Sequence, residues 1–224
     1  MKQVRLRNSI SLAMNLLLFI LVLLSLAWFF LPDGAQGVGN MNRGGVRVLI
    51  YFTVDSNILA ALACLLLIPF NLKSIRRGED MLPRWALLLK MIGTVAVTLT
   101  FAVVMLYFVP LVGPSMVLTG ANLPLHLLCP LLAIASFCFF ERGLFFTKRQ
   151  MLLGIVPAVL YGIVYLVQVV FLENWEDFYA FNVGGLWYVT IVAIPAVNYL
   201  FALGLRAVHN KFDKQPANKI GSAT

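Results

Sequence analysis

Six long apolar segments follow one another along the chain, separated by short stretches that hold most of the charged residues. The segments cover roughly 9–31, 46–70, 83–108, 119–140, 151–172 and 186–208. Each is long enough to cross the bilayer as an α-helix, which takes about 20 residues for about 30 Å of hydrocarbon. None alternates apolar and polar positions as a transmembrane strand does. The pattern predicts an all-α membrane bundle of six helices, one domain over 1–208, followed by a polar tail over 209–224.

The composition excludes several other classes of protein. Of 224 residues, 61% are hydrophobic and 12% are charged, whereas a soluble domain averages about 25% charged residues. A soluble domain, a disordered chain and a nucleic-acid-binding module are therefore not expected, despite the net charge of +8. The three cysteines lie in apolar segments without CxxC spacing, which argues against disulfides and a zinc site. We expect no metal, no other cofactor and no nucleic-acid partner.

The first segment follows Lys2, Arg5 and Arg7, as the apolar region of a signal peptide would. Its apolar run is longer than the roughly 7–15 residues of such a region. We therefore interpret it as a retained span.

Lysine and arginine positions predict the orientation, because they accumulate in cytoplasmic loops. Of the 17 basic residues, 14 fall on the side that holds both termini, two (Arg43 and Arg47) fall on the other side, and Lys90 lies within a span. The opposite side instead carries Glu173, Glu176 and Asp177. Both termini are predicted to be cytoplasmic, and the short loops suit a bacterial inner membrane.

Few polar residues interrupt the apolar segments, and each is a candidate for function because burying it in lipid is costly. They are Thr53, Asp55, Ser56, Asn57, Lys90, Asn122, His126, Gln168 and Asn198. Thr53 and His126 each lie seven residues inside the outer end of their segment, at a depth of about 10 Å. Matching depth makes them candidates for one site if their helices are neighbours.

The spacing of residues along a helix indicates which of these polar residues can share one site. Thr53 and Asn57 share a helix face, as do Asn122 and His126. Cys129 lies close to the His126 face, three residues on. Asp55 points largely away from Thr53, and either supports the site from behind or forms a separate interaction.

The chemistry of this set favours acyl transfer. A threonine hydroxyl becomes a nucleophile when a base removes its proton, and a neutral imidazole is suited to that role. Asn57 and Asn122 could donate hydrogen bonds to the developing oxyanion. Structural roles remain open as alternatives. The Thr53 hydroxyl could bond a carbonyl oxygen of its own helix, and His126 could form a hydrogen bond between two helices.

Two further charges leave alternatives open. Asp55 could pair with Lys90, and Lys90 could instead extend to the inner headgroups. Aromatic residues near the last outer loop are expected to form an interfacial belt. They are Trp175, Tyr179, Phe181, Trp187 and Tyr188.

The string Tyr51-Phe52-Thr53 with Asn57, and the later Leu125-His126 near a proline, resembles the androgen-induced-gene family and its bacterial relatives. The resemblance implies a multi-span membrane fold. It also implies a threonine hydrolase that cleaves fatty acid esters of hydroxy fatty acids, with Thr53 and His126 as the catalytic pair. The string FYAFN at 178–182 resembles the aromatic segment before the last span of the bacterial branch.

The expected function is thus hydrolysis of lipid acyl esters within the membrane, with membrane lipids as partners and the oligomeric state left open. Three alternatives remain. A related group of lipid acyltransferases has a similar LPLH context and a cysteine nucleophile, for which Cys129 would be the candidate. A transporter or channel for a small solute or proton would use Asp55, His126, Lys90 and Asn198. A structural membrane protein would use none of them.

Overall fold

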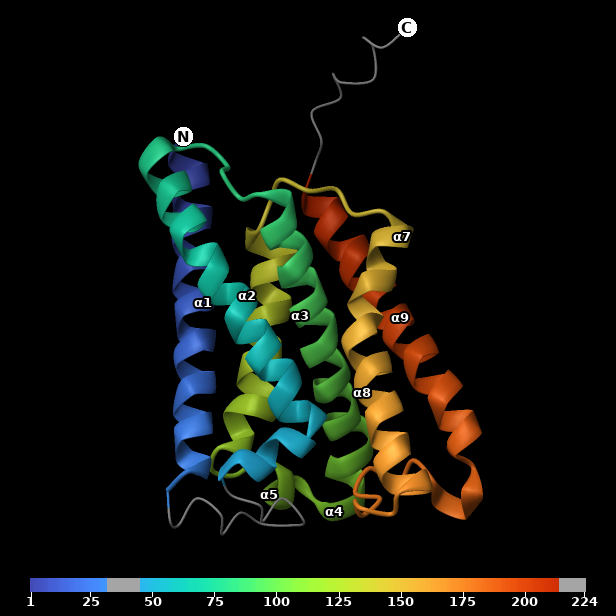
Figure 1. The fold of residues 1–224 in the computed structure, drawn as a ribbon. Helices are drawn as coiled ribbons and strands as arrows, with labels where there is room; N and C mark the ends of the chain where they lie inside the picture. Colours follow the sequence, from blue (N-terminus) through green and yellow to red (C-terminus); the bar gives the residue numbers. More distant parts are fainter. Residues whose placement is uncertain (32–44, 214–224) are drawn as a thin grey trace, which may run out of the picture.

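The computed structural model describes residues 1–31 and 45–213, and these form helices and turns without a strand (Figure 1). Five helical runs are long and apolar enough to cross a membrane. They are α1 (Lys2–Phe29), α2 (Phe52–Arg77), a run from α3 to α4 (Arg84–Val112), a run from α7 to η6 (Lys148–Phe171) and α9 (Trp187–Phe212). The fold is that of an integral membrane protein. The label η denotes 3-10 and π helices.

Two of these runs are composite. The first joins α3 (Arg84–Val103), the π-helix η2 (Val104–Phe108) and α4 (Val109–Val112). The second joins α7 (Lys148–Met151), η5 (Leu152–Ile155), α8 (Val156–Leu166) and the π-helix η6 (Val167–Phe171). Three short helices, η1 (Gly45–Ile50), α5 (Pro114–Val117) and η7 (Val183–Gly185), complete the connections.

The fourth predicted segment, 119–140, is a shorter apolar helix in the structure, Pro124–Phe140. It consists of the π-helix η3 (Pro124–Leu128), α6 (Cys129–Ala135) and the π-helix η4 (Ser136–Phe140). The chain reaches it through a turn in which Gly120 has a φ of 53°, so the helix begins later than the apolar pattern does. The structure therefore shows five long spans, and a sixth crossing by this helix stays a prediction.

Helices α1 and α2 lie side by side (Figure 1) and bury a seven-residue repeat of α1. The buried positions are Asn8, Ser11, Asn15, Leu18, Val22, Ser25 and Phe29. This alternating spacing of three and four residues is that of a coiled-coil seam. The half of the seam nearer the N-terminus is polar, which places amide and hydroxyl groups inside the bundle.

Helices α2 and α3 approach each other closely at Gly93. A Cβ added there would come within 2.9 Å of the Ala60 Cα atom. Small residues at such crossings let membrane helices pack by van der Waals contact. This contact sets the spacing between the helices that form two walls of the site described below.

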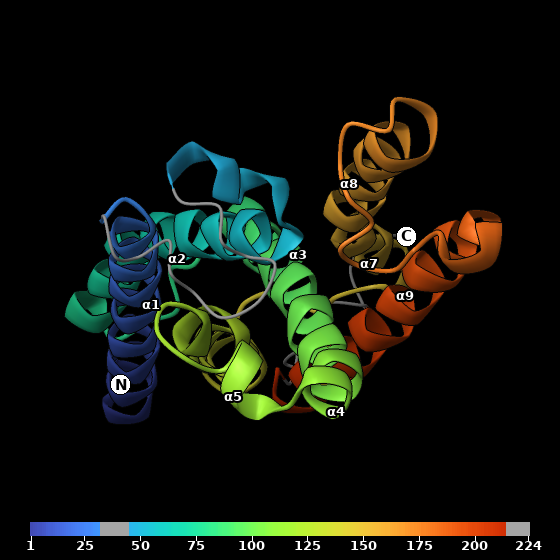
Figure 2. The ribbon, with the colours of Figure 1, turned by 90° about the horizontal axis from the view of Figure 1, so that it is seen from below.

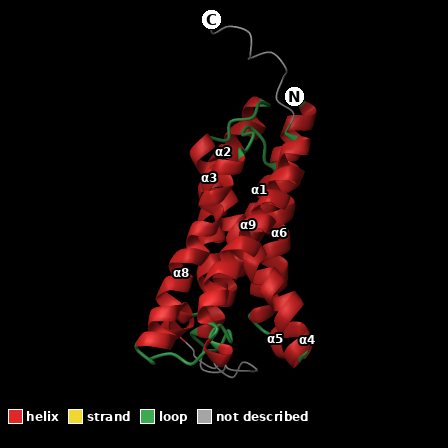
Figure 3. Cartoon of the chain, turned by 90° about the vertical axis from the view of Figure 1, so that its right-hand side faces the viewer, coloured by secondary structure: helices red, strands yellow, loops and turns green. Residues whose placement is uncertain are grey.

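Both described ends of the chain, the start of α1 and the end of α9, lie at the same end of the bundle (Figure 1). The loops gather at the two ends, as the side view shows (Figure 3). Arg43, and the part of the predicted tail that contains Lys214 and Lys219, lie outside the described residues. The cytoplasmic location of the termini stays a prediction.

The prediction that the polar tail begins at residue 209 is wrong. Helix α9 continues to Phe212, and His209 is fully buried. Its ring stacks on Phe137, with centroids 4.5 Å apart, and meets Phe146 edge-on. Its Nδ1 lies 2.8 Å from the Phe137 carbonyl oxygen and its Nε2 lies 3.1 Å from that of Leu144. These contacts attach the end of α9 to the neighbouring loop.

Candidate functional site

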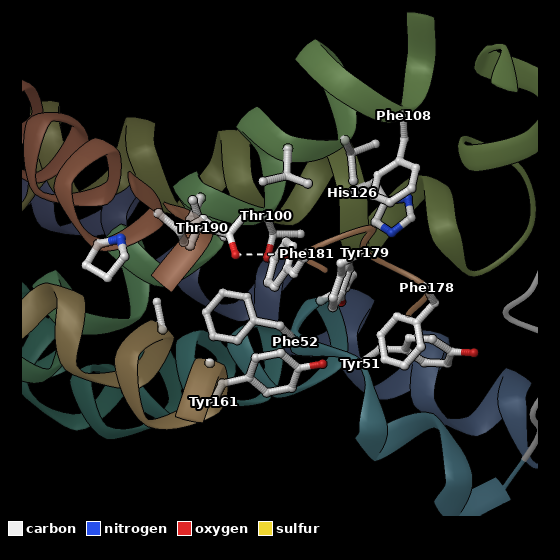
Figure 4. A pocket seen from close by; sticks show the side chains of 18 of the residues that line it. Tyr51, Phe52, Thr100, Phe108, His126, Tyr161, Phe178, Tyr179, Phe181 and Thr190 are labelled. Atoms are coloured by element: carbon white, nitrogen blue, oxygen red, sulfur yellow. Dashed lines mark hydrogen bonds between the residues drawn. The ribbon is translucent and has the colours of Figure 1, made fainter. Parts of the chain in front are cut away.

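A cavity of about 450 Å³ is lined by residues towards the end of the bundle opposite the termini (Figure 4). Its walls come from α2, α3, η2, α4, α5, η3, α8, α9 and the loop between η6 and α9. The lining is mostly apolar, with a small number of polar side chains. This size and character are typical of small-molecule sites, which span about 300–1,000 Å³. We call it the apolar cavity.

Thr53 lies in the first turn of α2, directly after a bend in the chain. Tyr51 precedes the helix with extended backbone angles (φ −100°, ψ 125°), which separates η1 from α2. The N–H groups of Val54 and Asp55 both bond to the Tyr51 carbonyl oxygen. The N–H groups of Phe52 and Thr53 come before these first helical hydrogen bonds and belong to the N-terminal turn, whose N–H groups have no partner within the helix. Thr53 is 5% exposed and lines the apolar cavity.

His126 lines the same cavity from the π-helix η3 (Figure 4). Its Nδ1 lies 2.6 Å from the Val117 carbonyl oxygen. A carbonyl oxygen can only accept a hydrogen bond, so Nδ1 carries the proton and the lone pair is on Nε2. The Nε2 atom is buried and bonds to no other described residue. His126 therefore presents an unoccupied proton acceptor in a site shielded from solvent.

Asn57 connects the two elements that carry Thr53 and His126. Its Nδ2 donates to the Thr53 carbonyl oxygen at 2.7 Å and to the Leu125 carbonyl oxygen at 3.0 Å. The side chain is fully buried and lies behind the cavity wall. Asn57 thus positions the site from behind, whereas Asn122 lines the cavity itself with an Oδ1 that has no partner within 1–31 and 45–213.

The sequence pattern missed Tyr179, which was expected in an interfacial belt. The structure places it in the cavity wall, with its hydroxyl buried and without a hydrogen bond of ordinary geometry to any described group. Burial raises the pKa of Tyr179 to about 12, although the Thr53 hydroxyl and the N–H groups of Phe52 and Thr53 lie close enough to lower it. The phenol is therefore neutral at physiological pH and can donate a proton in a hydrogen bond.

Asp177 holds the loop that carries Tyr179. One carboxylate oxygen accepts from the Tyr165 hydroxyl at 2.9 Å and from the Phe181 N–H at 2.8 Å. The other accepts from the Asn182 N–H at 2.8 Å. Tyr179 stacks on Phe181, with centroids 5.3 Å apart. The aromatic string at 178–182 was the one signal in the sequence for this arrangement.

Two predicted site residues lie outside the cavity. Asp55 is half-buried and faces a separate groove that Pro157 and Trp175 also line. Cys129 is fully buried with its Sγ 4.0 Å from the Leu18 carbonyl oxygen. A cysteine nucleophile at this position would have no access to the cavity, which weakens the acyltransferase alternative.

Lys90 pairs with Glu141, not with Asp55, and does not extend to headgroups. Its Nζ lies 3.5 Å from a Glu141 carboxylate oxygen, and the two side chains are 1% and 0% exposed. The same Nζ donates to the Asn15 Oδ1 at 2.7 Å and lies 2.9 Å from the Cys64 Sγ. Glu141 follows the fourth apolar segment directly, so the pattern of spans did not reveal that its side chain turns inwards.

Further amide and hydroxyl groups extend this cluster towards the end that holds the termini. Asn15 Nδ2 lies 3.2 Å from Glu141, and Asn71 Nδ2 donates to Ser11 at 3.2 Å. Asn71 also bonds Asn8, whose amide donates to Asp80 at 3.0 Å. We call this set the Lys90 network; its residues are Asn8, Ser11, Asn15, Cys64, Asn71, Lys90 and Glu141. The contacts of this network explain why the charged Lys90 side chain can lie within a span.

Comparisons with known protein families, with curated proteins and with solved structures find no match to this chain. Within the described ranges, no group of three or more His, Cys, Asp or Glu side chains is arranged to hold a metal ion. The assignment of function therefore depends on the geometry of the cavity and on the resemblance noted in the sequence.

Proposed function

We propose that this protein hydrolyses acyl esters of lipids within the membrane, with Thr53 as nucleophile and His126 as general base. One observation carries the proposal: Thr53 and the free Nε2 of His126 belong to the same apolar cavity. Acyl chains suit such a lining, because burying apolar surface stabilises the bound state. The androgen-induced-gene family, which the motifs resemble, implies the same pair.

The mechanism follows from the chemistry of these groups. His126 Nε2 takes the Thr53 hydroxyl proton as Oγ1 forms a bond to the ester carbonyl carbon. The carbonyl π electrons move to the oxygen and return when the alkoxide leaves, and His126 gives its proton to that alkoxide. Water, deprotonated by the same imidazole, then attacks the acyl-threonine ester and releases the fatty acid and Thr53.

The Tyr179 hydroxyl is suited to stabilise the oxyanion of both steps. It is neutral, buried and close to Thr53. The N–H groups of Phe52 and Thr53 add donors at the positive end of the α2 dipole. Such preorganised donors are effective where water is excluded, because the local dielectric constant is low.

The orientation in the membrane belongs to the same proposal. We infer a bacterial plasma membrane, cytoplasmic termini and Pro124–Phe140 as a short sixth crossing. The basic residues near the start of α1 and the end of α9 support this orientation through the positive-inside rule. The cavity would then lie in the outer half of the bilayer.

Turnover of a fluorogenic acyl ester by the purified protein in detergent tests the proposal. We expect Thr53→Ala and His126→Ala each to lower kcat/KM by about 10³-fold or more, as removal of a nucleophile or its base does. Thr98→Ala is the matched control, because Thr98 lies outside the cavity wall and its hydroxyl bonds the Thr94 carbonyl oxygen at 2.7 Å. A fluorophosphonate probe should label Thr53 in the wild type. Full turnover in both site variants would refute the assignment.

A further inference from the structure

The apolar cavity continues from Thr53 and His126 towards the gap between α8 and α9. On α8 its wall includes Gly162 and Ile163, and on α9 it includes Ile191 and Pro195. Ile163 and Ile191 line the cavity and are also 48% and 39% exposed. Side chains that line a cavity and also face outwards mark its opening. The cavity therefore reaches the surface of the bundle between these two helices.

The part of the cavity wall that α8 and α9 form is mostly apolar. Seen along the bundle, α8 and α9 diverge from each other near the loop that connects them (Figure 2). Thr190 lies on the cavity wall at the start of α9, and its hydroxyl already bonds the Phe181 and Trp187 carbonyl oxygens at 2.9 and 2.8 Å (Figure 4). The opening is therefore apolar in character, because the hydroxyl of Thr190 and that of Tyr161, which donates to the Ile50 carbonyl oxygen, are both already bonded.

The depth of the opening indicates which phase it faces. Gly162 lies nine residues before Phe171, the end of the spanning run Lys148–Phe171. At 1.5 Å per residue this is about 13 Å from that end, which places the glycine among lipid chains and below the headgroups. A ligand that enters here arrives sideways from the hydrocarbon. The hydrocarbon of a bilayer supplies acyl chains.

Gly162 leaves the passage wide. A Cβ added at this position would meet nothing within 4 Å. Gly204 on α9 is the matched case: a Cβ there also meets nothing within 4 Å, but this glycine is exposed and lies outside the cavity wall. A large side chain at Gly162 would obstruct the passage, whereas the same side chain at Gly204 would extend into lipid.

We propose that the opening between α8 and α9 is a lateral passage for a single acyl chain, and that the absence of a side chain at Gly162 keeps it open to long chains. The chain lies along the passage with its carbonyl end at Thr53 and Tyr179 and its tail towards the bilayer. This inference deepens the proposed hydrolase function. The passage itself requires only that an acyl chain binds.

Photocrosslinking tests the passage without any need for turnover. The wild type and Gly162→Phe are placed in phosphatidylcholine vesicles with a fatty acid that carries a diazirine on its tail. We expect mass spectrometry to map labels of the wild type to α8 and α9 lining residues. Gly162→Phe should lower this labelling at least fivefold, and Gly204→Phe should leave it unchanged. Equal labelling of the two phenylalanine variants overturns the proposal.

Turnover of esters of different length supplies a second measurement. Gly162→Phe should lower kcat/KM for a palmitoyl ester at least tenfold and leave that for an acetyl ester within twofold, because a short acyl group does not occupy the passage. If Gly162→Phe does not fold, Ile191→Trp narrows the opening from α9 with the same expected pattern. Equal losses for both esters count against the passage. Labelling as expected without any turnover in the wild type would refute the hydrolase and leave the passage intact.

Discussion

Two polar regions of this bundle differ in how many of their buried polar groups are hydrogen-bonded. In the Lys90 network, the ammonium group is bonded to Asn15 and paired with Glu141. Among the described residues of this network, one carboxylate oxygen of Glu141 is the single buried side-chain atom without a hydrogen bond. In the apolar cavity, His126 Nε2 and Asn122 Oδ1 have no partner among the described residues, and the Tyr179 hydroxyl lies near the Thr53 turn without a hydrogen bond of ordinary geometry. A buried polar group without a partner costs about 1–3 kcal/mol. Groups left open at that cost around a cavity are suited to bind a ligand, whereas the satisfied groups hold helices together.

Removal of one partner of the buried ion pair should give the largest effect on the folded state. Lys90→Met leaves the Glu141 carboxylate unpaired inside the bundle, which we expect to lower the free energy of unfolding by about 3–5 kcal/mol. Thermal unfolding of the detergent-solubilised protein measures the loss. The double variant Lys90→Met with Glu141→Gln should recover most of it, because no unpaired charge remains. A single variant as stable as the wild type would show that the network does not stabilise the fold.

Tyr179→Phe, in the cavity, should lower activity and leave stability intact, the opposite of the effect expected for Lys90→Met. Loss of one oxyanion donor is expected to reduce kcat by about 10²-fold or more, while the melting temperature changes little because no hydrogen bond of ordinary geometry is lost. Tyr188→Phe is the control, since Tyr188 lies outside the cavity wall and is 56% exposed. Unchanged turnover in Tyr179→Phe would remove this residue from the mechanism and leave Thr53 and His126 in place.

The smallest effect is expected at the outer edge of the Lys90 network. Arg7 pairs with Asp80 where both side chains are partly exposed, and such pairs contribute about 0–1 kcal/mol. Arg7→Ala should therefore change the free energy of unfolding by less than about 1 kcal/mol, measured as for Lys90→Met. A loss as large as that of Lys90→Met would mean that the network behaves as one cooperative unit up to the surface.

The apolar pattern predicted the five long helices, because lipid demands long apolar helices whatever their neighbours are. The orientation predicted from the basic loops stays a prediction. The matching depths of Thr53 and His126 are consistent with their placement in one cavity. Helix neighbours do not follow from such a pattern. For this reason Glu141 was not recognised as a buried residue and His209 was assigned to the tail, since each lies near the end of an apolar segment and turns into the bundle through contacts distant in sequence.

The position of Tyr179 in the cavity wall could not be predicted from the sequence pattern, for a related reason. It lies in a loop, and loops have no periodicity from which a facing direction follows. Its position depends on three hydrogen bonds to Asp177 and on the ring of Phe181. The same applies to Asn57, whose bond to the Leu125 carbonyl oxygen joins residues 68 positions apart.

The π-helical turn at η3 has a consequence for how this site can change over evolutionary time. A π turn accommodates one more residue than the α turn that would replace it, so residues on its two sides differ by about 100° from ordinary helical phase. Deletion of one codon within 124–128 would restore an α-helix and rotate the imidazole out of its present place in the cavity wall. The place of His126 in the same cavity as Thr53 thus depends on the length of this segment as much as on its amino acids, and a single deletion, without any substitution, is enough to remove it.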